Sequence, residues 1–266
     1  MRLALSGLAV LLMLLVDSAT PAQAEFYLSL FAGGSFPLSE DVEADLTIDT
    51  GVGTRRVMLK NLELMDVKIE NSFLYGGKAG YFFESRVLGG NVGLELEAYR
   101  FHPNLLQQSV STSPTFIPFG FFGGILVNEV VLEKSDLDVT GLALNALYRR
   151  SFGGSPRFPH GRLQVYTGPG MGMYIGHLKT TTSFLTPQTD IEDTRTEMGF
   201  QAVGGLKYFL TRHVGLFGEY RFVQTGTFDF QFEKRGTVGF SQGMEKLDLG
   251  LDLTDNQVYG GVAFHF

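Results

Sequence analysis

Seven charged residues recur at alternate positions of strand-like segments, and they are the side chains of this chain best placed to do chemistry. They are Lys78, Glu95, Glu97, Arg162, Lys207, Glu219 and Arg221. Because side chains alternate between the two faces of a strand, each is expected on the face opposite its apolar neighbours. Charges on an enclosed face must pair or meet water, since a lone buried ion is unstable. We predict a salt-bridged cluster; the functional alternative is a gate whose ion pairs exchange partners and pass small ions.

Catalytic or metal chemistry has weaker support in the sequence. The chain has no cysteine, which excludes disulfides, thiolate metal sites and a cysteine nucleophile. No histidine is followed two residues later by serine, and neither an HExxH zinc motif nor a phosphate-binding loop is present. The histidines are scattered along the chain: His102, His160, His177, His213 and His265. We therefore expect no catalytic residues, no metal and no cofactor.

The elements that must position the charged residues are strands with apolar and polar positions in alternation. In one segment Leu94 and Leu96 share a face, while Glu95 and Glu97 share the opposite one. Only a polar interior tolerates the second face, and lipid suits the first. Aromatic residues such as Phe101 and Phe209 lie near segment ends and suit interfacial girdles, although aromatics are also good strand formers. Eight segments fit this description: 26–36, 73–83, 91–101, 138–149, 161–175, 197–210, 213–223 and 256–266.

The start of the chain predicts export. Arg2 is followed by an apolar run that is too short to span a bilayer, and then by the small-x-small triplet that ends at Ala24. We predict a cleaved signal peptide at 1–24 and a single domain at 25–266. The net charge of −7 argues against a nucleic-acid partner.

The connections between the eight segments alternate between long and short. After the second, fourth and sixth segments they are short: 84–90, 150–160 and 211–212. The others are long: 37–72, 102–137, 176–196 and 224–255. Tight turns on the periplasmic side and long loops outside are typical of outer-membrane barrels. This pattern predicts that both chain ends lie on the periplasmic side.

A family resemblance supports the same fold. The segments GYFFES, VGLELEAYRFHP, LALNALYRR, VYTGPGMGM, GGLKYFLTRHVGLFGEYRF and VYGGVAFHF resemble the OmpA/OmpX-like superfamily of eight-stranded outer-membrane barrels. The resemblance implies an all-β, closed, antiparallel, up-and-down transmembrane barrel of about eight strands in the Gram-negative outer membrane. It also implies that Val258, Val262, Phe264 and Phe266 form a terminal signal for the barrel assembly machinery. Because the superfamily hosts unrelated activities, it implies little about function.

One cation breaks the alternation at the outer end of its segment. Strict alternation places Arg100 toward lipid, where its guanidinium could extend to the headgroups and contact lipopolysaccharide phosphates. A bulge that turns Arg100 inward is the alternative.

The long loops contain alternating segments of their own. We expect a hairpin over 46–70, and a second one in 224–255 that turns at Lys234 to Gly236, so that the loops form a β-structured crown. Two or four further membrane strands are the rival hypothesis, but the acidic residues of these loops disfavour lipid exposure. The apolar stretch 116–127 could pack over the barrel mouth or contact a partner.

We interpret the protein as a non-enzymatic membrane anchor for surface loops, with roles in envelope integrity, adhesion or external interaction. Its expected partners are outer-membrane lipid and lipopolysaccharide, the assembly machinery, and an external molecule bound through loops 102–137 and 224–255. A narrow porin-like or gated channel is the alternative, and a lipid-modifying enzyme is a distant third.

Overall fold

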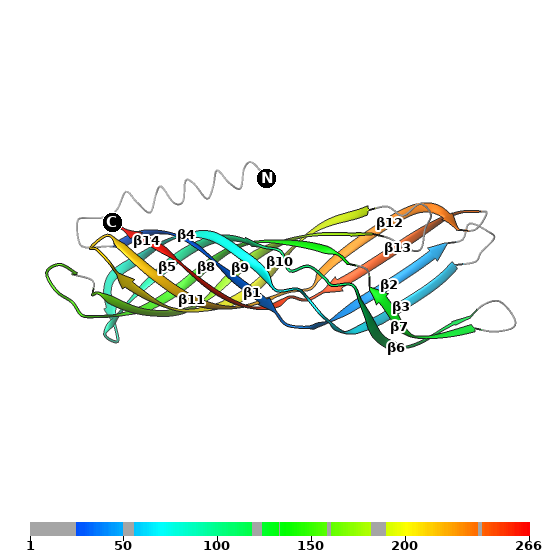
Figure 1. Cartoon of the computed structure of the whole chain (residues 1–266), viewed down its shortest axis with the longest axis horizontal. Coiled ribbons are helices and arrows are strands. Elements are labelled where there is room, and N and C mark those ends of the chain that lie inside the picture. The colour runs from blue at the N-terminus through cyan, green and yellow to red at the C-terminus, as the bar shows by residue number, and fades with distance from the viewer. Residues whose placement is uncertain are drawn as a thin grey trace.

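The computed structural model of the chain describes residues 25–49, 56–118, 124–132, 134–158, 161–181, 190–238 and 241–266. The predicted signal peptide lies outside these residues. In the described part of the chain, no helix is long and apolar enough to cross a membrane. Two sheets account for the strands, and they lie end to end in Figure 1.

The first sheet is a closed antiparallel barrel, which confirms the predicted fold class and the count of eight barrel strands. Around the barrel the strands follow the order β1-β14-β11-β10-β9-β8-β5-β4. Their bounds are β1 Glu25–Pro37, β4 Ser72–Val87, β5 Gly90–Phe101, β8 Asp136–Phe152, β9 Leu163–Thr181, β10 Asp190–Phe209, β11 Val214–Thr225 and β14 Thr254–His265. The first and last barrel strands pair directly, Tyr27 opposite His265, so the barrel has no free edge.

Alternation along each barrel strand separates a lipid face from an interior face. Leu94 is 45% exposed, whereas the next residue, Glu95, is 1% exposed. Tyrosines occupy much of the interior, and glycines on neighbouring strands make room for their rings. A Cβ at Gly80 would overlap the ring of Tyr27, and one at Gly141 would lie 2.7 Å from Cζ of Tyr99. The interior is therefore filled by side chains, as expected for a barrel of this size.

The second sheet extends beyond the barrel and forms the expected crown. Its order is β12-β13-β2-β3-β6-β7. The bounds are β2 Glu40–Asp49, β3 Arg56–Val67, β6 Gln108–Pro118, β7 Gly124–Leu132, β12 Phe228–Val238 and β13 Ser241–Leu251. Of these, β2, β3, β12 and β13 cover the segments that the rival hypothesis assigns to the membrane, and none of them joins the closed barrel.

One prediction for the crown is wrong, and another concerns side chains that the structure does not describe. The turn expected at Lys234 to Gly236 is wrong, because β12 continues to Val238, which pairs with Ser241. Pairing of Lys234 with Glu245 and of Gly236 with Gly243 keeps this stretch extended. The side chains of 116–127 lie outside what the structure describes, although the backbones of β6 and β7 pair as a hairpin.

One apolar core joins the barrel to the crown. Phe228, Phe230 and Phe232 of β12 are buried and stack in a row, with ring centroids 5.9 and 6.5 Å apart. They belong to the same buried cluster as Leu74 and Phe101 of the barrel interior. The crown is thus packed on the barrel by a continuous core.

Candidate functional site

Ion pairs cross the middle of the barrel interior. Nζ of Lys78 on β4 lies 2.5 Å from Oε2 of Glu219 on β11 and 3.4 Å from Oε2 of Glu95 on β5. NH1 of Arg221 on β11 lies 2.8 Å from Oε1 of Glu97 on β5. All five side chains are buried. Buried charges are tolerated here because each has an opposite charge and further hydrogen bonds.

Neutral polar side chains complete the network around the two β5 carboxylates. Tyr27 donates to Oε2 of Glu95 at 2.5 Å, and Tyr259 donates to Oε1 of Glu97 at 3.2 Å. The Asn145 amide donates to both carboxylates, at 3.1 and 3.3 Å. With these bonds each carboxylate has several donors, which fixes it in place.

A second group of charges lies nearer the end of the barrel that carries the short turns. The Glu25 carboxylate at the start of β1 lies 2.5 Å from NH1 of Arg149 and 2.5 Å from Nδ1 of His265. Nε2 of His265 is in turn 3.1 Å from Nζ of Lys207. This group links β1, β8, β10 and β14, so it ties the first and last strands to the opposite wall.

Six of the seven charged residues singled out in the sequence lie inside the barrel, and one does not. Arg162 is exposed, because it lies in the turn before β9, where Gly161 has a φ of 84° and the chain changes direction. Arg149 takes the interior place instead, and sequence reasoning missed it. The signal was present: Arg149 shares the odd-numbered, inward positions of β8 with Asn145 and Leu147.

The outer half of the barrel interior is mainly apolar. Leu74, Phe101, Val139 and Val223 are fully buried there. Two aromatic residues that were expected in interfacial girdles face the interior instead. They are Phe101 in this outer half, and Phe209 at the opposite end, where its ring lies 4.8 Å from that of His265. The main polar exception is Asp255, which accepts a hydrogen bond from Ser35 at 2.7 Å. The interior therefore changes from a charged layer to an apolar layer that continues into the crown.

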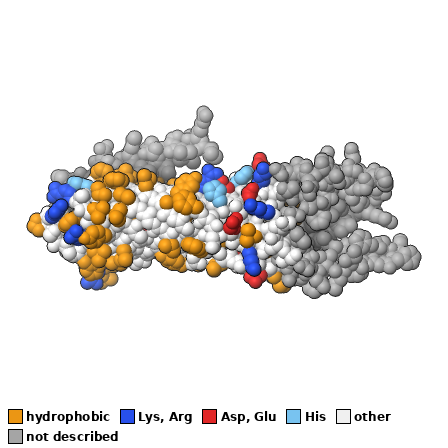
Figure 2. Space-filling model, viewed as in Figure 1, with side chains coloured by type: hydrophobic (Ala, Val, Ile, Leu, Met, Phe, Trp, Pro, Cys, Tyr) orange, Lys and Arg blue, Asp and Glu red, His pale blue; other side chains and the backbone are white. Residues whose placement is uncertain are grey.

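Arg100 faces outward, as strict alternation predicts, and no bulge turns it inward. Its Nε donates to Oδ1 of Asp138 at 2.7 Å, and its NH2 donates to Oδ2. This forked pair joins β5 to β8 near the end of the barrel that carries the crown. Figure 2 shows a belt of charged side chains across the visible face. The hydrogen bond from Arg100 lowers the pKa of Asp138.

Two histidines also reach this outer belt. Nε2 of His102 lies 3.6 Å from Oδ2 of Asp138, and Nδ1 of His177 lies 2.8 Å from Oγ1 of Thr194. No serine is hydrogen-bonded to either histidine in the described part of the chain, and no described group of His, Cys, Asp and Glu is suited to a metal.

The sequence also contains one G-x-S-x-G stretch, at 239–243. Hydrolases use this motif in a turn from a strand to a helix. Here Ser241 begins β13 and pairs with Val238 at the end of β12, so the motif joins two antiparallel strands.

The terminal residues predicted as the assembly signal lie on the outer face of β14 or directly after it. Val258, Phe264 and Phe266 are exposed, and Val262 is half-buried. The Phe266 ring lies 6.2 Å from the Phe26 ring, centroid to centroid, and the Phe266 amide donates to the Phe26 carbonyl at 2.9 Å.

Comparison with known proteins decides the family. The model of the outer membrane protein beta-barrel domain matches residues 7–266. The chain belongs to this family. Members of the outer membrane beta-barrel family lie in the bacterial outer membrane, and this chain does so too. No match was found among curated proteins.

Several solved outer-membrane barrels are similar to this family member. Neisserial surface protein A is 14% identical over 92% of this chain and 100% of that one, with a TM-score of 0.41. Ail, the attachment invasion locus protein of Yersinia pestis, solved with a heparin analogue, is 9% identical over 91% and 99%, with a TM-score of 0.35. The outer membrane protease OmpT of Escherichia coli is 10% identical over 91% and 97%, with a TM-score of 0.34.

Proposed function

We propose that this protein is a closed, non-enzymatic anchor that holds a β-structured crown on the outer surface of the cell. One observation carries the proposal: the core that attaches the crown is the same core that fills the outer half of the barrel. Phe228 and Phe230 of the crown contact the barrel at Gly176, where an added Cβ would lie 3.1 Å from the Phe228 ring. The crown is thus attached by the same packing that closes the barrel.

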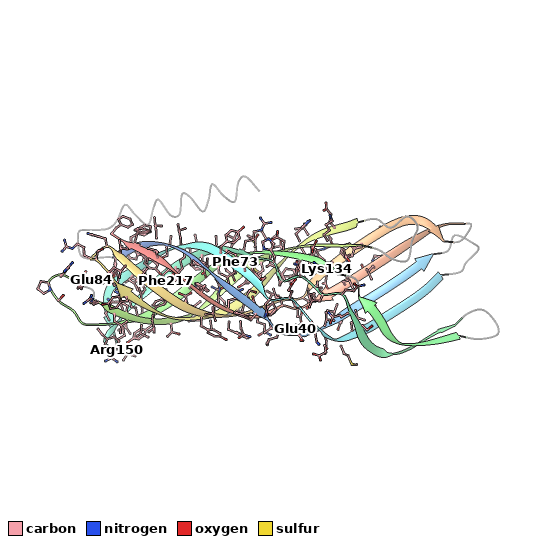
Figure 3. All side chains as sticks on the ribbon, in the orientation of Figure 1. Glu40, Phe73, Glu84, Lys134, Arg150 and Phe217 are labelled. Carbon is pink, nitrogen blue, oxygen red and sulfur yellow. The ribbon has the colours of Figure 1, made fainter. Side chains whose placement is uncertain are left out.

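The crown also carries the kind of surface an anchor would display. Along β2 and β12, exposed acidic residues alternate with buried apolar ones: Asp41 and Glu43 on β2, and Asp229 and Glu233 on β12. At the base of the crown, Glu40 and Lys134 mark where it meets the barrel (Figure 3). An acidic outer face would attract a partner with a basic surface.

Labelling of intact cells tests the display of the crown. The chain has no cysteine, so a single one introduced by Asp229→Cys reports on the crown and one by Glu84→Cys reports on a short turn. Both native side chains are exposed. We expect a maleimide on a long polyethylene glycol to label the Asp229→Cys variant on intact cells. The Glu84→Cys variant should react only after the outer membrane is permeabilised. Labelling of Glu84→Cys alone on intact cells would overturn the proposal.

A further inference from the structure

The turns at the periplasmic end carry a cluster of arginines. Arg150, Arg157, Arg162 and Arg212 are all exposed, and we call them the arginine collar. Basic side chains border the apolar band at this end in Figure 2, and Figure 3 labels Arg150 there. Among the described residues of these turns, Glu84 is the one exposed acidic side chain, besides the terminal carboxylate of Phe266. This end is therefore basic, although the whole chain has a net charge of −7.

Aromatic rings hold three guanidinium groups of the collar. The Cζ atom of Arg162 lies 4.9 Å from the centroid of Tyr208 and 5.3 Å from that of Phe158. Those of Arg150 and Arg157 lie 5.8 Å from the rings of Phe152 and Phe158. Stacking of this kind orders a guanidinium while leaving its N–H donors at the edge of the plane.

The collar has no acidic partner within the described part of the chain. No carboxylate there lies within 4.0 Å of a guanidinium nitrogen of Arg150, Arg157, Arg162 or Arg212. By contrast, Arg100 at the opposite end of the barrel is paired with Asp138 through two hydrogen bonds, from Nε and NH2. The two ends thus differ. The Arg100 guanidinium at the outer end is paired with a carboxylate of the protein, whereas the N–H donors of the collar can bind an anionic ligand.

The collar borders the membrane surface of the barrel. Phe152, Leu163, Tyr208 and Leu210 are exposed apolar side chains at the ends of β8, β9 and β10, next to the turns. Backbone hydrogen bonds place the collar beside them, since the Arg162 amide donates to the Phe152 carbonyl at 2.9 Å. Arginines directly beyond an apolar band lie at the depth of lipid headgroups.

We propose that the arginine collar binds the phosphates of anionic phospholipids in the periplasmic leaflet of the outer membrane. Arginine presents paired N–H donors that match phosphate oxygens, and each basic residue near an anionic membrane strengthens binding by about fivefold. A lipid surface is favoured over a soluble anionic polymer because the guanidinium groups lie beside lipid-facing side chains.

The absence of tryptophan from the chain allows a direct test. A single reporter, Phe152→Trp, is placed beside the collar, and the equally conservative Phe200→Trp near the outer end serves as its control. Each is refolded in vesicles of phosphatidylcholine and phosphatidylglycerol, with acyl-chain bromine on one lipid or the other. Bromine quenches an adjacent indole, so the ratio of the two quenching efficiencies reports the preference for anionic lipid. If Phe152→Trp folds poorly, Leu210→Trp is the second reporter.

We expect the Phe152→Trp reporter to prefer phosphatidylglycerol about fivefold or more, and the Phe200→Trp reporter to show no preference. In the Phe152→Trp protein, adding Arg150→Gln and Arg162→Gln should reduce the ratio of the two quenching efficiencies toward one. Adding Arg100→Gln should leave this ratio unchanged. Equal quenching by both lipids beside the collar would overturn the proposal. So would equal quenching together with a change of the Phe152→Trp emission that inorganic phosphate causes and chloride of equal ionic strength does not, because the collar would then bind the free ion only. Arginine-dependent retention on cell-wall sacculi without lipid preference would point to a polymer instead.

Discussion

The Arg221 guanidinium and the Glu97 carboxylate form a 2.8 Å ion pair between β11 and β5, two strands that lie diametrically opposite in the eight-stranded barrel. Both side chains are fully buried. A single ion pair therefore spans the whole interior, and the hydrogen bonds to Glu97 from Tyr259, Asn145 and Gln201 hold it in place.

Breaking this ion pair on one side should destabilise the barrel strongly. Glu97→Gln leaves the Arg221 cation buried without its counter-ion, which we expect to lower the free energy of unfolding by about 3–5 kcal/mol. The double variant Glu97→Gln with Arg221→Met should lose less than the sum of the single variants. Urea unfolding in vesicles, followed by the heat-modifiable shift in gel mobility, measures both. Additive losses would show that the two residues do not interact.

The two faces of β5 should respond differently to substitution. Leu96→Lys places a cation toward the hydrocarbon, and we expect it to lower the free energy of unfolding by roughly 2–4 kcal/mol. Glu95, the adjacent residue on β5, faces the interior. Glu95→Gln keeps the size of this side chain and most of its hydrogen bonds, so we expect a smaller loss of unfolding free energy than for Leu96→Lys. Leu96→Ala controls for lost side-chain volume. Similar losses for Leu96→Lys and Leu96→Ala would contradict the assignment of the lipid face.

The Arg100–Asp138 pair should contribute a small stability with a defined pH dependence. Because the Arg100 hydrogen bond lowers the pKa of Asp138, the contribution is fully present above the ordinary aspartate pKa of about 3.9 and is lost as the pH falls through the lower folded value. Both groups are partly solvated, so we expect only about 0.2–1 kcal/mol. The difference in unfolding free energy between the parent and Asp138→Asn, measured from pH 7 to pH 2, should begin to shrink only when the pH falls below about 4. A difference that shrinks between pH 7 and pH 5 would contradict this.

Substitution of the terminal phenylalanine should separate assembly from stability. Phe266 and Phe200 are both 72% exposed, so replacing either ring by serine removes little packing. We expect Phe266→Ser to refold normally in vitro but to reach the outer membrane several-fold less in cells, and Phe200→Ser to show a much smaller defect. Fractionation of cells and refolding yields measure the two effects. Normal membrane levels of Phe266→Ser would argue against an assembly signal at the terminus.

The barrel strands and their faces could be predicted from sequence because the alternation of a strand is a local property. Leu94 against Glu95, and Phe264 against His265, reveal their faces from neighbouring residues alone. Alternation fails where a turn intervenes. Gly161 has a positive φ, and it directs Arg162 outward although counting by twos directs it inward.

The pairing of charges and the apolar layer could not be predicted in the same way. Whether Lys78 meets Glu219 or Glu97 depends on the strand stagger around the whole barrel, which no single segment encodes. Phe101 could be taken for a girdle residue from sequence, because its place at a strand end suits both an interface and an interior. Only the crown, packed above it through Phe228, shows that the interior at this level is apolar.

The proposed anchor requires a closed barrel interior, and single-channel recording in planar bilayers measures this most directly. The chain would be refolded from residue 25 onward and checked by its heat-modifiable gel shift, alongside Arg221→Ala, which removes the charged crossing but leaves the apolar layer. We predict that neither protein conducts in steps. Discrete conductance of the parent that changes with Arg221→Ala would contradict the account and identify the charged layer as a gate.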